Sequence, residues 1–300
     1  MGLLRKLEGG AGWLLRTRDI LGRSQACTIR LDGPQVSGEH AVLRWTGAHW
    51  HIQDLGSRNG VYVDGRRLGQ DERAVVRAGA VIGLGTAAYT LSDDAPPIAF
   101  ATRVGGGAEA TILAVGEILT LPGPGDGAMI VRAAAGWSLE DADEVRRIAD
   151  DEVVIVGDAA WRVCLPDAPA ATADAHGDGP RLDALRLRFT VSRDEEYVEL
   201  VAFHRERMFD FKARAHHYPL LVLARVRLRA PAAEGWIDQN ELLRLLRFDR
   251  SQLHRDIHRL RVEFGEAGIE GAPRVVERRA GTRKLRIGVA DFEIVPLANP

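Results

Sequence analysis

Residues 37–63 read SGEHAVLRWTGAHWHIQDLGSRNGVYV, a segment in which short apolar runs alternate with turn-forming residues. The runs at 41–45 and 50–52 are rich in β-branched or aromatic side chains, which is typical of short, half-buried strands. Thr46-Gly47 and Asn59-Gly60 fall beside these runs, and glycine supplies the positive φ that tight hairpin turns need. The segment therefore predicts the antiparallel strands of a β-sandwich.

The same pattern continues on both sides of this segment. Gly22-Arg23 precedes it, and residues 79–85 follow as GAVIGLG, another apolar run between glycines. The region lacks the order of strand, Gly-rich loop and helix that cradles a nucleotide. We therefore expect residues 1–95 to form an all-β sandwich and not a βαβ enzyme domain.

The order and spacing of these motifs resemble the forkhead-associated (FHA) domain, a phosphopeptide-binding β-sandwich. The resemblance implies that loops at one end of the sandwich bind phosphothreonine, and that the partner is a phosphothreonine-containing protein of a Ser/Thr protein kinase pathway. It assigns the phosphopeptide contacts to Arg23, Ser37, Arg58 and Asn59. It assigns structural support of the loops to Gly22, His40 and Gly60.

Two arginines carry the charge of this expected site. Arg23 suits a phosphate because a guanidinium group matches phosphate oxygens bidentately. The chain departs from the commonest FHA pattern at Gly38, where a basic residue often follows the serine. Arg58, in the neighbouring loop, is expected to substitute for it.

Length and composition set limits on the rest of the chain. Its 300 residues exceed one β-sandwich, so two or three domains are expected. Cys27 and Cys164 fit no metal or redox spacing. The two cysteines make no disulfide framework in a chain of this size, so a reducing cytoplasm is expected. Since no apolar stretch reaches 18 residues, we expect no membrane contact.

Charge is distributed unevenly along the chain. Residues 1–95 carry 12 basic and 10 acidic side chains (net +2), residues 96–180 carry 5 and 14 (net −9), and residues 181–300 carry 23 and 18 (net +5). The middle is acidic and β-rich, with strands expected at 110–115, 117–121, 129–132 and 153–156. Residues 96–166 are thus expected to form a separate segment of unknown role, followed by a flexible linker over 167–181.

Two capping patterns predict adjacent helices in the C-terminal third. Asp238 is followed three residues later by Glu241, and Asp249 by Gln252, the spacing of an N-terminal capping box. Apolar residues then recur at intervals of four, three and four, which places them on one buried helix face: Leu253, Ile257, Leu260 and Phe264. The pattern indicates a helix-turn-helix.

The elements around these helices extend the pattern. Strand-like runs at 185–191, 197–203 and 208–212 and an apolar helix beginning near Pro219 come before them, and a basic hairpin at 274–287 follows. This order is similar to the winged-helix DNA-binding domains of response regulators, over roughly residues 182–290. The hairpin departs from that family at 281–285, where GTRKL replaces the usual Gly-x-Gly-Tyr.

The second resemblance implies contacts to double-stranded DNA from the solvent-facing side of the second helix and from the hairpin. The residues expected to make them are Ser251, His254, Arg255, His258, Arg259, Arg278, Arg279, Arg283 and Lys284. Winged helices also serve as protein-docking modules, which leaves protein interaction as the alternative use of this domain.

The sequence gives little support for catalysis. His216-His217 stands just before an apolar helix, without a carboxylate or cysteine nearby at metal-ligand spacing, and no hydrolase, metalloprotease or kinase signature occurs. We expect a non-enzymatic protein with no cofactor and no metal site. The predicted function is phosphothreonine-dependent signal transduction and transcription regulation through DNA binding. The alternative is a phosphorylation-dependent adaptor of a kinase or secretion complex that does not bind DNA.

Overall fold

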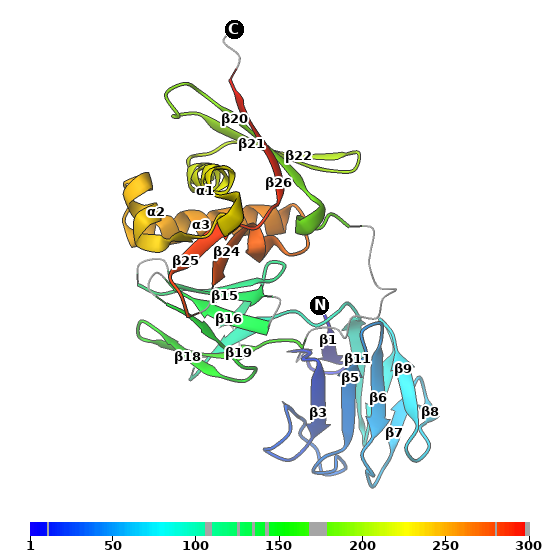
Figure 1. Cartoon of the computed structure of the whole chain (residues 1–300). Helices are drawn as coiled ribbons and strands as arrows, with labels where there is room; N and C mark the ends of the chain where they lie inside the picture. The colour runs from blue at the N-terminus through cyan, green and yellow to red at the C-terminus, as the bar shows by residue number, and fades with distance from the viewer. Residues whose placement is uncertain are drawn as a thin grey trace. The chain divides into compact units, whose positions relative to one another are not determined.

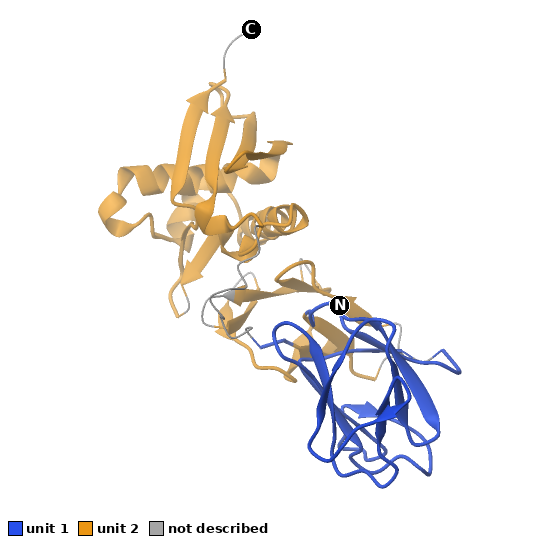
Figure 2. Cartoon of the chain, turned by 90° about the vertical axis from the view of Figure 1, so that its right-hand side faces the viewer, with its two compact units in different colours: residues 1–98, 165–173 blue, residues 99–164, 174–300 orange. Residues whose placement is uncertain are grey.

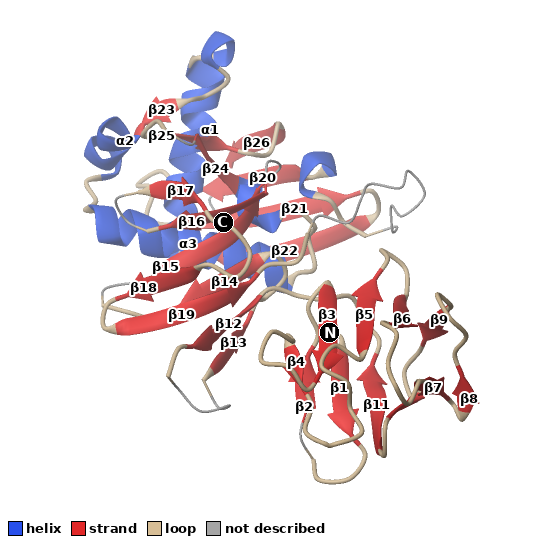
Figure 3. Cartoon of the chain, turned by 90° about the horizontal axis from the view of Figure 1, so that it is seen from below, coloured by secondary structure: helices blue, strands red, loops and turns tan. Residues whose placement is uncertain are grey.

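The computed structural model describes residues 1–10, 12–105, 110–124, 127–133, 136–141, 144–167, 179–279 and 281–297. Most of the predicted linker, 167–181, lies outside the described residues. The chain divides into two compact units (Figure 2): the first contains residues 1–98 and a short segment that begins at Leu165, and the second contains residues 99–164 and the C-terminal part of the chain. All described helices belong to this C-terminal part (Figure 3).

The first unit consists of two β-sheets (Figure 1). The five-stranded sheet has the order β4 (Ile29–Arg30), β3 (Arg18–Gly22), β5 (Ala41–Trp45), β6 (Trp50–Asp54) and β9 (Arg73–Val76). The six-stranded sheet has the order β2 (Gly12–Leu14), β1 (Leu3–Lys6), β11 (Ala87–Asp93), β10 (Val81–Leu84), β7 (Val61–Val63) and β8 (Arg66–Arg67). The prediction of an N-terminal β-sandwich is confirmed.

Alternating burial within the strands explains why this sandwich forms. In β5, Ala41 and Leu43 are fully buried while Arg44 is exposed, and β6 buries Trp50 and Ile52. These inner side chains join those of the other sheet in one core cluster. The β5–β6 hairpin turns at Gly47, whose φ of +94° lies in the left-handed region, as the turn pattern predicted.

The second unit begins with a middle module, residues 99–164, built from two four-stranded antiparallel sheets. One has the order β13 (Thr111–Leu113), β12 (Phe100–Arg103), β19 (Ala159–Cys164) and β18 (Val153–Val156). The other has the order β14 (Ile118–Leu121), β15 (Ala128–Ala133), β16 (Gly136–Glu140) and β17 (Val145–Arg147). The four predicted strands are confirmed as β13, β14, β15 and β18, whereas β12, β16, β17 and β19 were not predicted.

The C-terminal module, residues 182–296, combines a sheet, three helices and a hairpin. The sheet has the order β22 (Arg207–Ala213), β21 (Val198–His204), β20 (Arg186–Val191) and β26 (Asp291–Pro296). The helices are α1 (Tyr218–Arg229), α2 (Gln239–Leu246) and α3 (Arg250–Glu266). The hairpin consists of β24 (Val276–Arg279) and β25 (Lys284–Ile287), with β23 (Ile237–Asp238) paired to β25. The described residues of this module also form four short 3-10 helices: η1 (Leu182–Ala184), η2 (Ala215–His217), η3 (Pro231–Ala233) and η4 (Ala272–Val275).

The aspartate half of each predicted capping box forms. An Asp238 carboxylate oxygen accepts the Asn240 N–H at 2.9 Å, and an Asp249 oxygen accepts the Gln252 N–H at 2.7 Å, which satisfies otherwise orphaned donors of the first turn. The predicted order of sheet, helices and hairpin is present, and β26 adds a parallel strand to β20 beyond residue 290. The assignment to the winged-helix family stays a prediction. No helix among the described residues is long and apolar enough to span a membrane.

Candidate functional site

Three loops meet at one end of the N-terminal sandwich: 23–28 after β3, 31–40 before β5, and 55–60 between β6 and β7. Backbone hydrogen bonds join the first two loops, because the Arg23 N–H donates to the Ser37 carbonyl oxygen and the Ser24 N–H to the Gly38 carbonyl oxygen, both at 2.9 Å. The third loop is held to the second by the Arg58 N–H, which donates to Ser37 Oγ at 3.1 Å. The loops therefore form one connected surface.

Two glycines permit this close approach. A Cβ atom on Gly22 would lie 2.2 Å from the Gly38 carbonyl oxygen, so any larger residue would push the first two loops apart. Gly60 has a φ of +81°, and a Cβ there would meet Arg67 Nε at 2.5 Å. Both positions need glycine for a local reason, and the predicted supporting roles of Gly22 and Gly60 agree with this geometry.

His40 braces the loops from inside. It is fully buried, its Nδ1 accepts the Ser37 N–H at 3.0 Å, and its Nε2 lies 3.2 Å from the Gly60 carbonyl oxygen. Because Nδ1 is an acceptor, the proton of the neutral ring is on Nε2, which donates to Gly60. The ring thus connects the second and third loops, as its predicted structural role requires.

Ser57, inside the motif of residues 54–60, has a structural role that was not predicted. Its N–H and Oγ donate to the two Asp54 carboxylate oxygens at 2.7 and 3.1 Å, and its Oγ accepts the Gly60 N–H at 2.9 Å. These bonds fix the third loop internally. The Asp-x-x-Ser spacing was the signal that could have predicted this turn.

The structure brings the four expected phosphopeptide contacts together on these loops. Arg23 and Arg58 are exposed, while Ser37 and Asn59 are half-buried. Asn59 Nδ2 donates to the Gln35 carbonyl oxygen at 2.7 Å. The side-chain amide has a second N–H and an acceptor oxygen. The bond to Gln35 therefore orients Asn59 and leaves these two groups able to form further hydrogen bonds. Two cations and a hydroxyl on one rigid surface suit a phosphate group.

In the second unit, helix α3 is buried on two sides. Leu253, Ile257, Leu260 and Phe264 are nearly or fully buried in the C-terminal core, as predicted. A neighbouring side contacts the middle module, where His258 Nε2 lies 2.8 Å from Thr120 Oγ1. The acidic middle segment therefore packs directly on the helix that was expected to read DNA.

A buried ion network is the centre of this contact. Arg261 Nη1 and Nη2 bind the two Glu140 carboxylate oxygens at 2.8 and 3.3 Å, and Nη2 also donates to the Val276 carbonyl oxygen at 2.9 Å. Arg278 Nη1 lies 3.6 Å from Glu140 and donates to the Asp141 carbonyl oxygen at 3.1 Å. Burial opposes ionisation of Glu140, but the charges of Arg261 and Arg278 outweigh it and lower the pKa of the carboxyl group.

This contact corrects part of the predicted DNA-binding set. His254 is only 2% exposed, so the prediction that it faces solvent is wrong. The Arg278 side chain is 5% exposed and pairs with Glu140, so its predicted contact with a DNA backbone is also wrong for this conformation. His258 is half-buried and bonded to Thr120. The structure leaves the following predicted residues exposed or half-exposed: Ser251, Arg255, Arg259, Arg279, Arg283 and Lys284.

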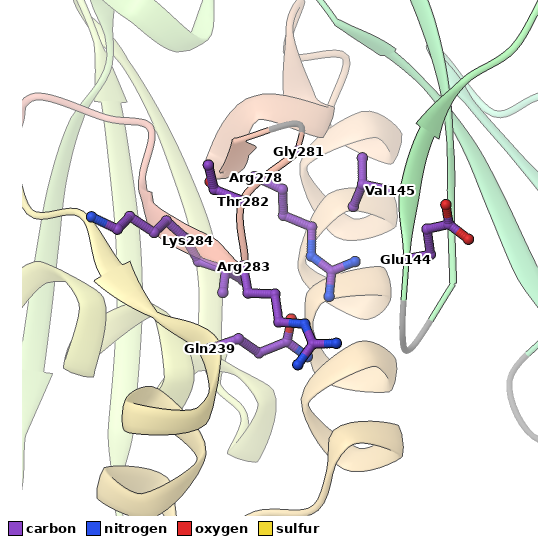
Figure 4. A pocket seen from close by; sticks show the side chains of 9 residues that line it. Glu144, Val145, Gln239, Arg278, Gly281, Thr282, Arg283 and Lys284 are labelled. Carbon is purple, nitrogen blue, oxygen red and sulfur yellow. The ribbon is translucent and has the colours of Figure 1, made fainter.

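A hollow of about 270 Å³ separates the hairpin from the β17 end of the middle module. Its lining includes Glu144 on one side and Gln239, Arg278 and Arg283 on the other. Figure 4 shows the guanidinium groups of Arg278 and Arg283 directed into this space, while Lys284 points away from it. Two cationic groups are thus directed into the hollow.

Two comparisons with known sequences find matches to part of the chain. Residues 20–85 match the model of the FHA domain family. FhaB of Mycobacterium tuberculosis, an FHA domain-containing protein, is 32% identical over 72 residues, which is 24% of this chain and 45% of that protein. FhaB of Mycolicibacterium smegmatis is 33% identical over 64 residues, 21% of this chain and 41% of that protein. The match thus spans less than half the length of these relatives.

Two solved structures are also similar to part of this chain. The FHA domain of the CT664 protein from Chlamydia trachomatis is 34% identical and covers 31% of this chain and 98% of its own, with a TM-score of 0.29. Mycobacterium tuberculosis EmbR in complex with a low affinity phosphopeptide is 30% identical and covers 32% of this chain and 25% of its own, with a TM-score of 0.30. From the family match and the two curated relatives, residues 20–85 are an FHA domain, a phosphopeptide-binding module.

Proposed function

We propose that this chain is a phosphothreonine-dependent regulator, in which the FHA domain binds a phosphorylated protein and the C-terminal module binds DNA. One observation carries the first half: Arg23, Ser37, Arg58 and Asn59 lie on loops that His40 and Gly22 hold in a fixed arrangement. Rigid loops bind with little loss of conformational entropy. The partner is a phosphothreonine-containing protein of a Ser/Thr kinase pathway.

A pair of labelled peptides tests this part directly. Fluorescence anisotropy of the full chain with a threonine-phosphorylated peptide, and with its unphosphorylated twin, measures the dependence on phosphate. We expect binding of the phosphorylated peptide alone. Equal affinity for both peptides would rule out phosphate recognition by these loops.

The departure at Gly38 gives a sharper prediction. A Cβ atom on Gly38 has no neighbour within 4 Å, so an arginine fits there. If Arg58 replaces the missing basic residue, Arg58→Ala should weaken phosphopeptide binding about tenfold, equivalent to about 1.4 kcal/mol. Adding Gly38→Arg should restore part of that loss. Calorimetry on the four proteins of this cycle measures the coupling, and strictly additive effects would show that the two positions do not share a role.

The proposal of DNA binding rests on the exposed side of α3 and on the hairpin. Arg259 is exposed at the surface of α3, and Arg279, Arg283 and Lys284 surround the hairpin tip. An arginine-bearing helix beside a basic hairpin suits a groove and the adjacent phosphates. The middle module covers part of the predicted surface, because Thr120 contacts His258 and Glu140 pairs with Arg278, so the proposal rests on the residues that stay exposed.

Two double variants separate base contacts from phosphate contacts. Arg255→Ala with Arg259→Ala should abolish sequence preference, whereas Arg283→Ala with Lys284→Ala should weaken binding to all DNA and flatten its salt dependence. Anisotropy with fragmented genomic DNA at several salt concentrations measures both. Unchanged DNA binding by a protein with all four substitutions would exclude this surface. Salt-insensitive binding to a protein partner would favour the adaptor function instead.

A further inference from the structure

The fold brings together three side chains that the sequence keeps apart. His216 and His217 end η2, and Glu263 lies in α3, 46 residues further along the chain than His217. His216 Nε2 lies 3.0 Å and His217 Nε2 lies 2.8 Å from the same oxygen, Glu263 Oε2. The expectation that the histidine pair has no nearby carboxylate is therefore wrong, because Glu263 supplies one through the tertiary fold.

The surrounding packing holds this triad in place. The backbone N–H of His217 donates to the Arg214 carbonyl oxygen at 3.0 Å, which closes the η2 turn. Next to Glu263, Phe264 stacks on Phe211 of β22 with ring centroids 4.6 Å apart. Both elements that carry the triad are thus anchored in the C-terminal core, and the donor atoms are positioned before any ligand arrives.

The three donor atoms suit a transition-metal ion. They all lie within 4.8 Å of one another, and two imidazole nitrogens with one carboxylate oxygen form a common donor set for zinc. In a tetrahedral zinc site with bonds of about 2.0–2.2 Å, neighbouring ligand atoms are separated by about 3.3 Å. The distances to Glu263 Oε2 need to lengthen by only a few tenths of an ångström to reach that value, and the two histidine nitrogens, which lie within 4.8 Å of each other, need to reach the same separation.

The burial of the triad leaves one side accessible. His217 is fully buried, whereas the His216 and Glu263 side chains are 15% and 21% exposed. A hollow of about 420 Å³, lined in part by His216, Glu263 and Arg259, opens on these two. The hollow gives an ion a route to the site and gives water room for a fourth coordination position.

The two imidazoles must change their hydrogen bonding when a metal binds. Each Nε2 atom faces Glu263 Oε2, and coordination needs the Nε2 lone pair, so a proton on Nε2 must leave or move to Nδ1. His217 Nδ1 is buried and has no hydrogen-bond partner among the described residues, so the support that usually orients a metal-bound imidazole is incomplete.

We propose that His216, His217 and Glu263 bind one divalent transition-metal ion, with Zn²⁺ the best match to the donor set. The ion would join η2 to α3 and so fix the end of β22 against the helix. This proposal does not depend on phosphopeptide or DNA binding. The incomplete support of His217 predicts an affinity about 10- to 100-fold below that of a site with both imidazoles fully supported.

Isothermal titration of the EDTA-treated full chain with Zn²⁺ tests the proposal. We expect one equivalent to bind and the thermal midpoint of the second unit to rise. His216→Ala and Glu263→Gln should each lower the Zn²⁺ affinity at least tenfold. His51→Ala removes a half-exposed histidine from β6 in the other unit and should leave the affinity unchanged.

A second measurement needs no variant and so does not depend on whether a variant folds. Zn²⁺ should protect His216 from modification by diethyl pyrocarbonate, as mapped by mass spectrometry, without protecting His51. The alternative is that Glu263 simply accepts hydrogen bonds from both imidazoles. Any of three results would overturn the proposal and leave this alternative. They are no Zn²⁺ binding by the folded wild-type chain, equal Zn²⁺ affinity of His216→Ala, and no protection of His216 from diethyl pyrocarbonate by Zn²⁺.

Discussion

Replacing Glu140 by glutamine should destabilise the second unit by about 3–5 kcal/mol, because breaking a buried ion pair from one side leaves an uncompensated charge. Glu140 is 4% exposed and Arg261 is 1% exposed. The neutral amide can still hydrogen-bond, but it cannot balance the Arg261 and Arg278 guanidinium groups. Chemical denaturation measures the loss in the free energy of unfolding. Hydrogen exchange of residues 128–133 and 253–264 measures the local loss of stability on each side of the contact.

Two controls separate charge pairing from other effects. Glu144→Gln changes an exposed carboxylate between β16 and β17 and should shift the stability by no more than about 0.5 kcal/mol. Glu140→Met combined with Arg261→Met and Arg278→Met removes the carboxylate and both cations and should recover most of the loss, since apolar side chains avoid the desolvation of the three charges. A loss below about 1 kcal/mol for Glu140→Gln would mean that the network contributes little to the packing of the middle module on α3.

The contact between Glu140 and Arg261 also marks a limit of sequence analysis. A glutamate at a strand end is usually exposed, and nothing near residue 140 indicates a partner 121 residues away. The spacing of Leu253, Ile257, Leu260 and Phe264 correctly located the core side of α3. Helical periodicity cannot reveal a second buried side, however, because that side is defined by another part of the chain. This is why His254 was expected at the surface. Arg278 lies on the hairpin, and it was expected at the surface because the sequence does not show that Glu140 of the middle module covers it.

The phosphopeptide loops could be predicted more fully because their signals are local. Gly22 and Gly60 occupy positions where a Cβ atom does not fit. Such positions require glycine, and a glycine can be recognised directly in the sequence. The bond from Arg58 N–H to Ser37 Oγ connects the motifs at residues 37–41 and 54–60. The order of these motifs along the chain resembles the FHA domain family. The metal-ligand triad had no comparable signal, since Glu263 lies on a helix far along the chain from His216-His217.

The loops also support the last prediction, that Arg23→Ala weakens phosphothreonine-peptide binding by about 1.5–3 kcal/mol, about ten- to a hundredfold, through loss of charge-assisted hydrogen bonds. Folding should survive, because the Arg23 side chain is exposed and its structural bond comes from the backbone N–H to Ser37. Calorimetry of the full chain with phosphorylated and unphosphorylated peptides measures the effect.

Arg18→Ala is the matched control for this prediction. Arg18 is an exposed arginine at the opposite end of β3, so its removal changes the net charge equally but at a distance from the loops. If Arg23 contacts the phosphate directly, only Arg23→Ala should strongly reduce the affinity for the phosphopeptide. This reduction should remain at high salt, because salt screens long-range attraction between charges more than a direct contact. Equal losses of affinity for Arg23→Ala and Arg18→Ala would instead indicate general electrostatic attraction of the phosphopeptide, without direct contact between Arg23 and the phosphate.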